Sequence, residues 1–223
     1  MSDLCIRDLV YKVNDGTRNK TLLKIDNLKI NSGSHCVLKG ASGSGKTTFL
    51  RLISGIVTPQ NGDVCWGGVN ISKLQSTQRD RWRGLNVGFL FQDFRLFDGL
   101  SALENVLLPC GFYGKATQND KTRAKDLLDV VGVCPTTRTS HLSRGEMQRT
   151  ALARLLMMKP SVILAAEPTA SLDTQNAQHV LDLLVTVAKE VSATLIVASH
   201  DPSILQRFDR CLKVQDETVL FEN

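Results

Sequence analysis

Eight consecutive residues have the types and the spacing that a phosphate-binding loop requires. They run from Gly40 to Thr47 and match G-x-x-x-x-G-K-[ST] at every fixed position. Glycines allow backbone N–H groups to point at phosphate oxygens, Lys46 can neutralise the β- and γ-phosphates, and the Thr47 hydroxyl can ligate Mg²⁺. The competing interpretation is a flexible Gly/Ser loop. The candidate phosphate-binding residues are Gly40, Ala41, Ser42, Gly43, Ser44, Gly45, Lys46, Thr47 and Thr48.

Three polar side chains follow apolar stretches that are typical of buried strands. In an open α/β sheet, ligands bind beyond the carboxyl ends of parallel strands, so these side chains are candidates for a shared site. The competing interpretations are a strand-ending polar residue, a surface glutamate and a structural histidine. The three residues are Gln92 after Val87–Phe91, Glu167 after Val162–Ala165 and His200 after Thr194–Ala198.

A second candidate phosphate contact lies at the start of a long apolar helix. The stretch Leu142–Arg149 reads LSRGEMQR, and Met147–Met158 is rich in Leu, Ala and Met. A serine and exposed N–H groups at a helix start can bind a phosphate. The competing interpretation is an ordinary helix start, with Ser143 and Glu146 forming a capping box.

The elements that must position these residues begin with an antiparallel part. Leu4–Val10 and Leu22–Ile30 alternate apolar and polar residues, which predicts half-buried strands joined by a hairpin loop over Asn14–Lys20. A short buried strand, Cys36–Leu38, precedes the phosphate loop. The helix Lys46–Ser54 follows the loop and ends at Gly55. Asn61-Gly62 predicts a turn, and Asp63–Trp66 predicts a strand.

The carboxyl-terminal half has the pattern of a parallel sheet. The apolar runs Val162–Ala165 and Thr194–Ala198 flank a helix, Ala177–Glu190, which predicts a βαβ unit buried on both faces. Leu212–Phe221 reads as a closing hairpin. Between Asp93 and about Pro160, helical spacing over Ala102–Leu108, Thr122–Val131 and Met147–Met158 predicts an inserted helical subdomain.

Composition limits the class of protein. The chain has 223 residues, 42% apolar and 22% charged, which suits one globular domain with an insertion. Six scattered cysteines lack C-x-x-C spacing, so we expect reduced thiols rather than a zinc site or a disulfide framework. We expect no signal peptide and no membrane span. A net charge of +5 is too mild to imply nucleic acid, and the basic stretch Arg79–Arg83 reads as a solvated face.

Together these motifs resemble the ABC ATPases over nearly the whole chain. The resemblance implies an α/β P-loop NTPase core with a mostly parallel sheet, an N-terminal antiparallel β-subdomain and the helical subdomain at about 93–160, all in one domain spanning 1–223. It also implies binding of ATP and Mg²⁺ by a head-to-tail homodimer.

The same resemblance implies individual roles. Glu167 corresponds to the general base, Gln92 to the residue that contacts Mg²⁺ and the attacking water, and His200 to a γ-phosphate contact. Ser143, Gly145 and Glu146 correspond to the signature, which meets the γ-phosphate held by the opposite subunit. Ser171–Asp173 corresponds to the loop that crosses to the partner, and Tyr11 to the ring that stacks on adenine, although Tyr11 is also compatible with a core position.

The sequence departs from the family pattern at three positions. Ala166 stands where the family has an aspartate that holds the Mg²⁺ shell, and a methyl group cannot accept hydrogen bonds from metal-bound water. Arg144 replaces the usual first glycine of the signature, and Glu146 replaces the usual glutamine. These departures leave open an ATP-binding switch module that hydrolyses little.

The stretch from Phe94 to Val106 is similar to the lipoprotein-releasing, macrolide-export and cell-division branch of the family. That branch implies an integral membrane permease as partner, a peripheral location at the cytoplasmic face of the inner membrane, and no nucleic acid. Phe94, Leu96 and Phe97 would line a groove for a coupling helix of the permease. Their competing interpretation is the core of the helical subdomain.

Overall fold

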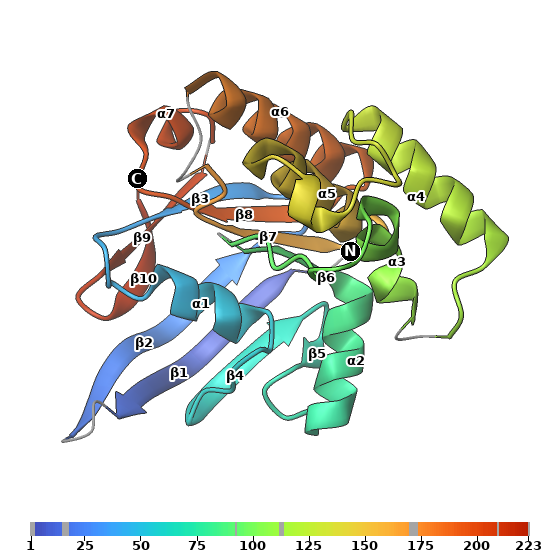
Figure 1. Cartoon of the computed structure of the whole chain (residues 1–223). Helices are drawn as coiled ribbons and strands as arrows, with labels where there is room; N and C mark the ends of the chain where they lie inside the picture. The colour runs from blue at the N-terminus through green and yellow to red at the C-terminus, as the bar shows by residue number, and fades with distance from the viewer. Residues whose placement is uncertain are drawn as a thin grey trace.

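Two sheets form the framework of the protein (Figure 1). The computed structural model describes residues 3–14, 18–91, 93–111, 114–169, 174–208 and 210–222. The first sheet is antiparallel, has four strands and has the order β2-β1-β4-β5. Its strands are β1 (Leu4–Asn14), β2 (Asn19–Ile30), β4 (Asn61–Trp66) and β5 (Val69–Asn70).

In the antiparallel sheet, one prediction from the sequence, the turn at Asn61-Gly62, is wrong. Asn61 and Gly62 do not form a turn: they open β4, beside an irregularity in its pairing with β1. Gly62 has φ +87°, and a Cβ there would come within 2.4 Å of the Asp8 carbonyl oxygen. The backbone of Asp8 therefore approaches so closely that only glycine fits at position 62.

The second sheet has six strands in the order β10-β9-β3-β8-β7-β6. Strands β3, β6, β7, β8 and β9 run parallel, and the β9–β10 hairpin closes one edge, as expected. Every residue of β7 and β8 is buried, which explains their uninterrupted apolar sequences. The strands are β3 (His35–Lys39), β6 (Val87–Leu90), β7 (Val162–Ala166), β8 (Thr194–Ala198), β9 (Arg210–Gln215) and β10 (Thr218–Glu222).

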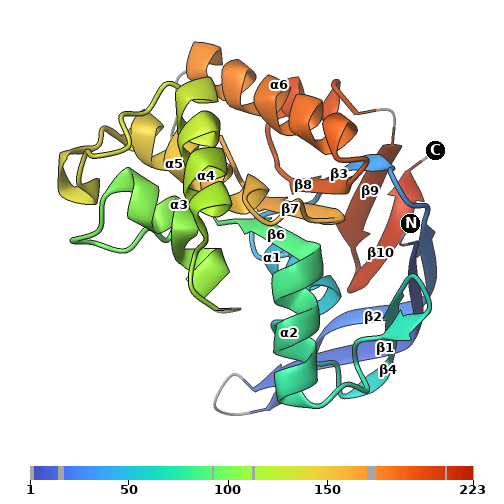
Figure 2. The ribbon, with the colours of Figure 1, turned by 90° about the vertical axis from the view of Figure 1, so that its right-hand side faces the viewer.

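Helices cover both faces of the parallel sheet (Figures 1 and 2). Helix α1 (Lys46–Ile53) lies between the two sheets and shares a core with the antiparallel sheet. Helices α5 (Arg144–Leu156), α6 (Thr174–Glu190) and α7 (Pro202–Leu205) lie on the opposite face. Successive side chains of β7 point to opposite faces of the sheet and therefore belong to different cores. Leu164 faces α1, whereas Ile163 faces α5 and α6.

A smaller core lies beyond the end of the sheet. It joins α3 (Ala102–Gly111) and α4 (Gln118–Val130) to one side of α5, and the turn η1 (Thr139–His141) leads into α5. Helix α2 (Ser76–Asn86) packs beside β6, and the sequence analysis missed it. No described helix is long and apolar enough to cross a membrane.

The structure confirms the predicted fold class. An antiparallel sheet, a mostly parallel sheet and the surrounding helices form an α/β P-loop NTPase fold. The predicted strands and helices are present with ends shifted by a few residues. The largest shifts are four residues, at the end of β1 and at the start of α4, and helices α5 and α6 begin three residues before the apolar spacing becomes clear.

Candidate functional site

The phosphate loop connects β3 to α1. Gly45, the last residue before the helix, has φ +105°, a left-handed conformation that favours glycine. Lys46 begins α1, and its Nζ donates hydrogen bonds to the carbonyl oxygens of Gly40 and Ala41 at 2.8 and 3.1 Å. Only 8% of Lys46 is exposed, so its ammonium group is held within the backbone of the loop.

The loop fits a phosphate group. The Ser44 hydroxyl oxygen is buried and has no hydrogen-bond partner among the described residues. A buried polar group without a partner is unfavourable, and an incoming acceptor would satisfy it. Residues Ala41 to Gly43 and Thr47 are exposed, so a ligand can reach the backbone N–H groups and the Thr47 hydroxyl. Thr48 is half-buried beside them.

Glu167 lies directly opposite the loop lysine. Its Oε1 is 3.7 Å from Lys46 Nζ and 3.0 Å from His200 Nδ1. Glu167 follows the last residue of β7 and has φ +48°, and its amide donates to the Ala198 carbonyl at 2.9 Å. A non-glycine residue in this conformation at the end of a buried strand is a strained position of the kind found at active sites.

His200 reaches the same point from the next strand, β8. Its side chain is 70% exposed, whereas that of Glu167 is 17% exposed. The residue before it, Ser199, is fully buried, and its amide donates to the Leu38 carbonyl of β3. The ends of β3, β7 and β8 therefore bring Lys46, Glu167 and His200 together, as the strand-end argument predicts.

Ala166 occupies the face of β7 that is turned to α1. It is 5% exposed and belongs to the same core cluster as Leu50 of α1, whereas Ala165 belongs to the opposite cluster. A side chain at position 166 therefore points to the helix that carries Thr47. Among the described residues, no group of three or more His, Cys, Asp or Glu side chains gathers as a metal site.

Ser143 and Glu146 contact each other rather than the phosphate loop. Ser143 caps α5, and its amide and hydroxyl both donate to the Glu146 carboxylate, at 2.8 and 2.7 Å. These hydrogen bonds hold the pKa of the Glu146 carboxyl below its ordinary value. Gly145 is half-buried next to them, and the Arg144 guanidinium lies 5.7 Å from the centre of the Phe94 ring.

Tyr11 lies in β1, close to the phosphate loop. It pairs with Leu23 of β2, and Leu23 packs 3.3 Å from the position of a Cβ on Gly45. Its ring is half-buried and also packs on the core, so the structure accommodates both interpretations of Tyr11. Gln92 and the stretch Ser171–Asp173 lie outside the described residues.

Sequence reasoning missed two polar side chains of α5. Gln148 is fully buried, and its Nε2 donates to the carbonyl oxygen of Pro168, the residue after Glu167. Arg154 donates to the carbonyl oxygens of Phe94 and Arg95, both at 2.6 Å. One signal was available for Gln148: with Ala151, Leu152 and Leu155 it has the spacing of an apolar stripe, where a polar residue is unexpected.

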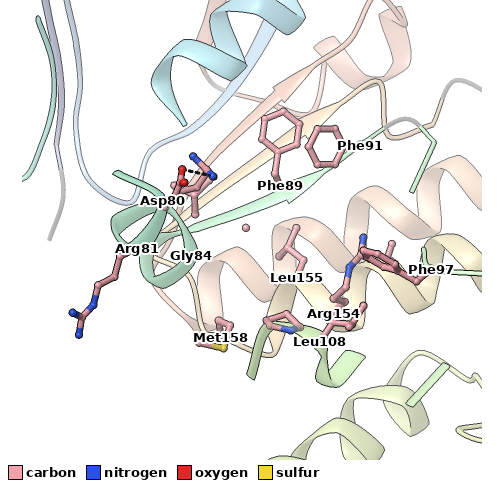
Figure 3. Close-up of a pocket in the computed structure, with 15 residues that line it drawn as sticks. Asp80, Arg81, Gly84, Phe89, Phe91, Phe97, Leu108, Arg154, Leu155 and Met158 are labelled. Carbon is pink, nitrogen blue, oxygen red and sulfur yellow. Dashed lines mark hydrogen bonds and ion pairs between the residues drawn. The ribbon is translucent and has the colours of Figure 1, made fainter. Parts of the chain in front are cut away.

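A cavity of about 940 Å³ opens between α2, β6, α3 and α5 (Figure 3). Phe89 and Phe91 stack with ring centres 4.2 Å apart at one side, and Phe97, Leu108 and Leu155 line it further along. Of the three residues expected in a groove, Phe97 lines this cavity and is 57% exposed. Phe94 is buried in the core between the parallel sheet and α5, not in the core of the helical subdomain, whereas Leu96 packs against both cores.

Comparison with known proteins identifies the family. The family model described as ABC transporter matches residues 23–170. The chain belongs to the ABC transporter ATP-binding family. Members of this family are ATPases, so the chain is an ATP-binding ATPase subunit of a transporter.

Individual relatives agree with this assignment. The chain is 36% identical over 220 residues to the lipoprotein-releasing system ATP-binding protein LolD of Legionella pneumophila, and the match covers 97% of each chain. It is 38% identical to an uncharacterised ABC transporter ATP-binding protein of Mycobacterium tuberculosis, over 94% of this chain and 86% of the relative. The resemblance to the lipoprotein-releasing branch is thereby confirmed.

A solved structure matches nearly the whole chain. It is a dimeric ATP-binding cassette in a post-hydrolysis state bound to ADP and Pi, with a TM-score of 0.90 and 30% identity, and the match covers 99% of this chain and 98% of that one. Its dimeric state supports self-association of this ABC cassette.

Proposed function

We propose that the chain is the ATP-hydrolysing motor subunit of a membrane transporter of the lipoprotein-releasing type. The observation that carries the proposal is the convergence of Lys46, Glu167 and His200 at the phosphate loop. A buried cation, a carboxylate and an imidazole at one point are the groups that phosphoryl transfer to water uses.

Each group has a task that follows from its position. Lys46 and the loop amides hold the phosphates, and Glu167 accepts a proton from the attacking water. His200, which touches Glu167 at 3.0 Å, orients that carboxylate and reaches the γ-phosphate. Bound Mg²⁺, held by Thr47 and Gln92, would neutralise charge that develops on the phosphate oxygens.

The pair between Lys46 and Glu167 must open for this chemistry. In the structure, Glu167 Oε1 lies 3.7 Å from Lys46 Nζ, so the carboxylate and the ammonium neutralise each other. A triphosphate brings a stronger anion to Lys46, and Glu167 then turns to the water. The site thus exchanges one counter-ion for another when ATP binds.

We further propose a head-to-tail homodimer in which Ser143, Gly145 and Glu146 of one subunit meet the ATP of the other. Ser143 and Arg144 at the start of α5 are exposed. A phosphate from outside would replace the Glu146 carboxylate as the acceptor of the Ser143 amide and hydroxyl. Glu146 is an anion there: the hydrogen bonds from Ser143, and then the nearby charge of Arg149, lower the pKa of its carboxyl.

Ser143→Ala tests this dimer. Removing the cap should lower the free energy of unfolding by about 1 kcal/mol and should also abolish ATP-dependent dimerisation, measured by light scattering in the Glu167→Gln form with Mg·ATP. Thr117→Ala is the matched control, because Thr117 and Asp120 form an equivalent capping box at the start of α4. The control should lose similar stability and still dimerise. Equal dimerisation of both variants would contradict the head-to-tail arrangement.

We also propose that the cavity beside β6 receives an apolar segment of the permease. It combines stacked aromatic rings with a charged end, where Arg81 lies and Arg83 forms an ion pair with Asp80, for which a second carboxylate would compete. Such a lining suits an amphipathic helix that carries a carboxylate. Through this contact the chain would lie at the cytoplasmic face of the inner membrane.

Phe97→Ser tests the groove. The variant should lose binding to inside-out membrane vesicles from the native cell, measured by sedimentation, while ATP affinity is unchanged. Leu220→Ser is the control: Leu220 is equally exposed, at 57%, and lies in β10 at the far edge of the sheet. Vesicles of extracted lipid should bind neither form. Equal loss in both variants would show that the groove is not the docking site.

We propose a second function on the departures from the family pattern at Ala166, Arg144 and Glu146. A chain that lacks the Mg²⁺-shell carboxylate can bind ATP and dimerise without fast turnover, and it would then regulate a permease by nucleotide occupancy. A long-lived ATP-bound dimer that releases no phosphate would support this switch function.

A further inference from the structure

We infer that Cys5 and Cys65 form a binding site for a soft monovalent metal ion of the Cu(I) class, in which the two thiolates are the ligands. The two residues are far apart in the sequence, but β1 and β4 lie side by side in the antiparallel sheet (Figure 1). Cys5 and Cys65 are direct partners in that pairing, and neither forms a disulfide. The site is separate from the phosphate loop and does not depend on the proposed function.

Both side chains point to the same face of the antiparallel sheet. Residues directly opposite each other in an antiparallel pair share a face, and successive residues of a strand alternate between faces. The neighbours Leu4 and Val64 are fully buried in the core that also contains α1. Cys5 and Cys65 therefore point to the outer face, where both are partly exposed and an ion can reach them from solvent.

The hydrogen-bond pattern sets the distance between the two cysteines. The Gly67 amide donates to the Asp3 carbonyl at 3.0 Å. Hydrogen-bonded pairs recur at every second residue of an antiparallel ladder, so Cys5 and Cys65 are also such a pair. The Cα atoms of such a pair are about 5.5 Å apart and the Cβ atoms about 4.5–5.5 Å. Both sulfur atoms can thus reach one ion without a change in the backbone.

The number and type of ligands select the class of metal. Among the described residues, no third His, Cys, Asp or Glu joins the pair to make a larger cluster. A structural zinc site needs four ligands, and Ca²⁺ and Mg²⁺ need oxygen ligands. Thiolates favour soft ions such as Cu(I), a d¹⁰ ion that two thiolates can bind in a linear arrangement.

The charges around the pair suit this complex. Two thiolates and one monovalent cation leave a net negative charge. On the same face, Lys29 lies opposite Cys5 in β2 and forms an ion pair with Asp3 at 3.5 Å. Arg7 lies two residues beyond Cys5 in β1, opposite Asp63, which has its own lysine partner. The guanidinium of Arg7 is therefore placed to offset the charge of the metal complex.

Two other cysteines provide matched controls. Cys110 is partly exposed, as Cys5 and Cys65 are, but it lies in the helix α3. Cys134 is exposed in the turn after α4, and its Sγ lies 3.4 Å from the Thr136 hydroxyl. Replacing either of them removes a thiol of comparable accessibility and leaves the pair on the antiparallel sheet intact.

A Cu(I) titration of the reduced full chain, without oxygen and in competition with a chromogenic Cu(I) chelator, tests the site. The parent chain should bind one ion at this site. Cys5→Ser and Cys65→Ser should each lower the affinity about a hundredfold or more, because each removes one of two ligands. Cys110→Ser and Cys134→Ser should keep the parent affinity. Parent affinity in either Cys5→Ser or Cys65→Ser would overturn the inference.

X-ray absorption at the copper edge tests the ligand set in the parent chain alone, so it decides the proposal even if a variant does not fold. Two sulfur neighbours are expected, and three or more ligands to copper would overturn the two-thiolate site.

Thermal unfolding tests the selectivity for soft ions. An ion that joins β1 to β4 binds the folded chain, so one equivalent of Cu(I) should raise the Tm of the parent and of Cys134→Ser but not of Cys5→Ser. Zn²⁺ at the same concentration should leave the Tm of the parent unchanged. A rise with Zn²⁺ as large as with Cu(I), lost in Cys5→Ser, would overturn the assignment to a soft monovalent ion.

Discussion

Ala166→Asp will raise the steady-state rate of ATP hydrolysis by about tenfold or more in the presence of Mg²⁺. Position 166 is the last residue of β7, and its side chain faces the core that contains α1. A carboxylate there would accept hydrogen bonds from metal-bound water next to Thr47. The metal would then be held where negative charge develops during phosphoryl transfer.

Ala166→Asn is the control for this experiment. The amide has the size of the acid but no negative charge, so it should restore much less activity than the acid. If Ala166→Asn raises the hydrolysis rate as much as Ala166→Asp, the parent chain lacks a side chain of this shape at position 166 rather than a negative charge. If the parent chain and Ala166→Asp both bind ATP and neither turns it over, the defect extends beyond one residue, and the switch function takes precedence over the motor.

Glu167→Gln, made in the Ala166→Asp form, will lower kcat by about a hundredfold or more while ATP still binds. The amide keeps the shape of the side chain but cannot accept the proton of water. It also loses the ion pair with Lys46, so ATP no longer competes with a carboxylate for that lysine. Affinity for ATP, measured by calorimetry, should therefore be unchanged or higher.

Glu104→Gln provides the matched change from acid to amide. Glu104 is exposed, and its carboxylate bonds to Ser101 at the start of α3, away from the nucleotide. This variant should keep kcat and KM. A similar loss of rate in both variants, or turnover that survives Glu167→Gln, would remove Glu167 from the role of general base.

The sequence predicted which candidate residues lie together wherever that depends only on their order along the chain. Gly40–Thr47 are contiguous, and Glu167 and His200 follow apolar strands whose carboxyl ends meet at one sheet edge. Glu167 and His200 come into contact because β7 and β8 are parallel neighbours in the sheet. Two apolar runs that flank one helix predict this arrangement.

Contacts that depend on three-dimensional packing were not predictable in the same way. Helix α2 was missed because none of its residues is buried, so no apolar period marks it, and its start is fixed by a capping box of Gln75 and Gln78. Arg154 was missed because its partners are backbone carbonyls of a strained turn about sixty positions earlier. Asn61-Gly62 was mistaken for a turn because the close approach of Asp8 is a tertiary contact.

The bond between Gln148 and Pro168 has a consequence for the dimer as a whole. Helix α5 begins after its cap Ser143, and through Gln148 it is attached to the turn that carries Glu167. In the proposed head-to-tail pair, Ser143 would contact the partner's nucleotide, whereas Glu167 would act on the nucleotide of its own subunit. We therefore propose that one rigid helix in each subunit couples the occupancy of the neighbouring site to the local carboxylate, so that the two sites hydrolyse as a pair rather than one at a time.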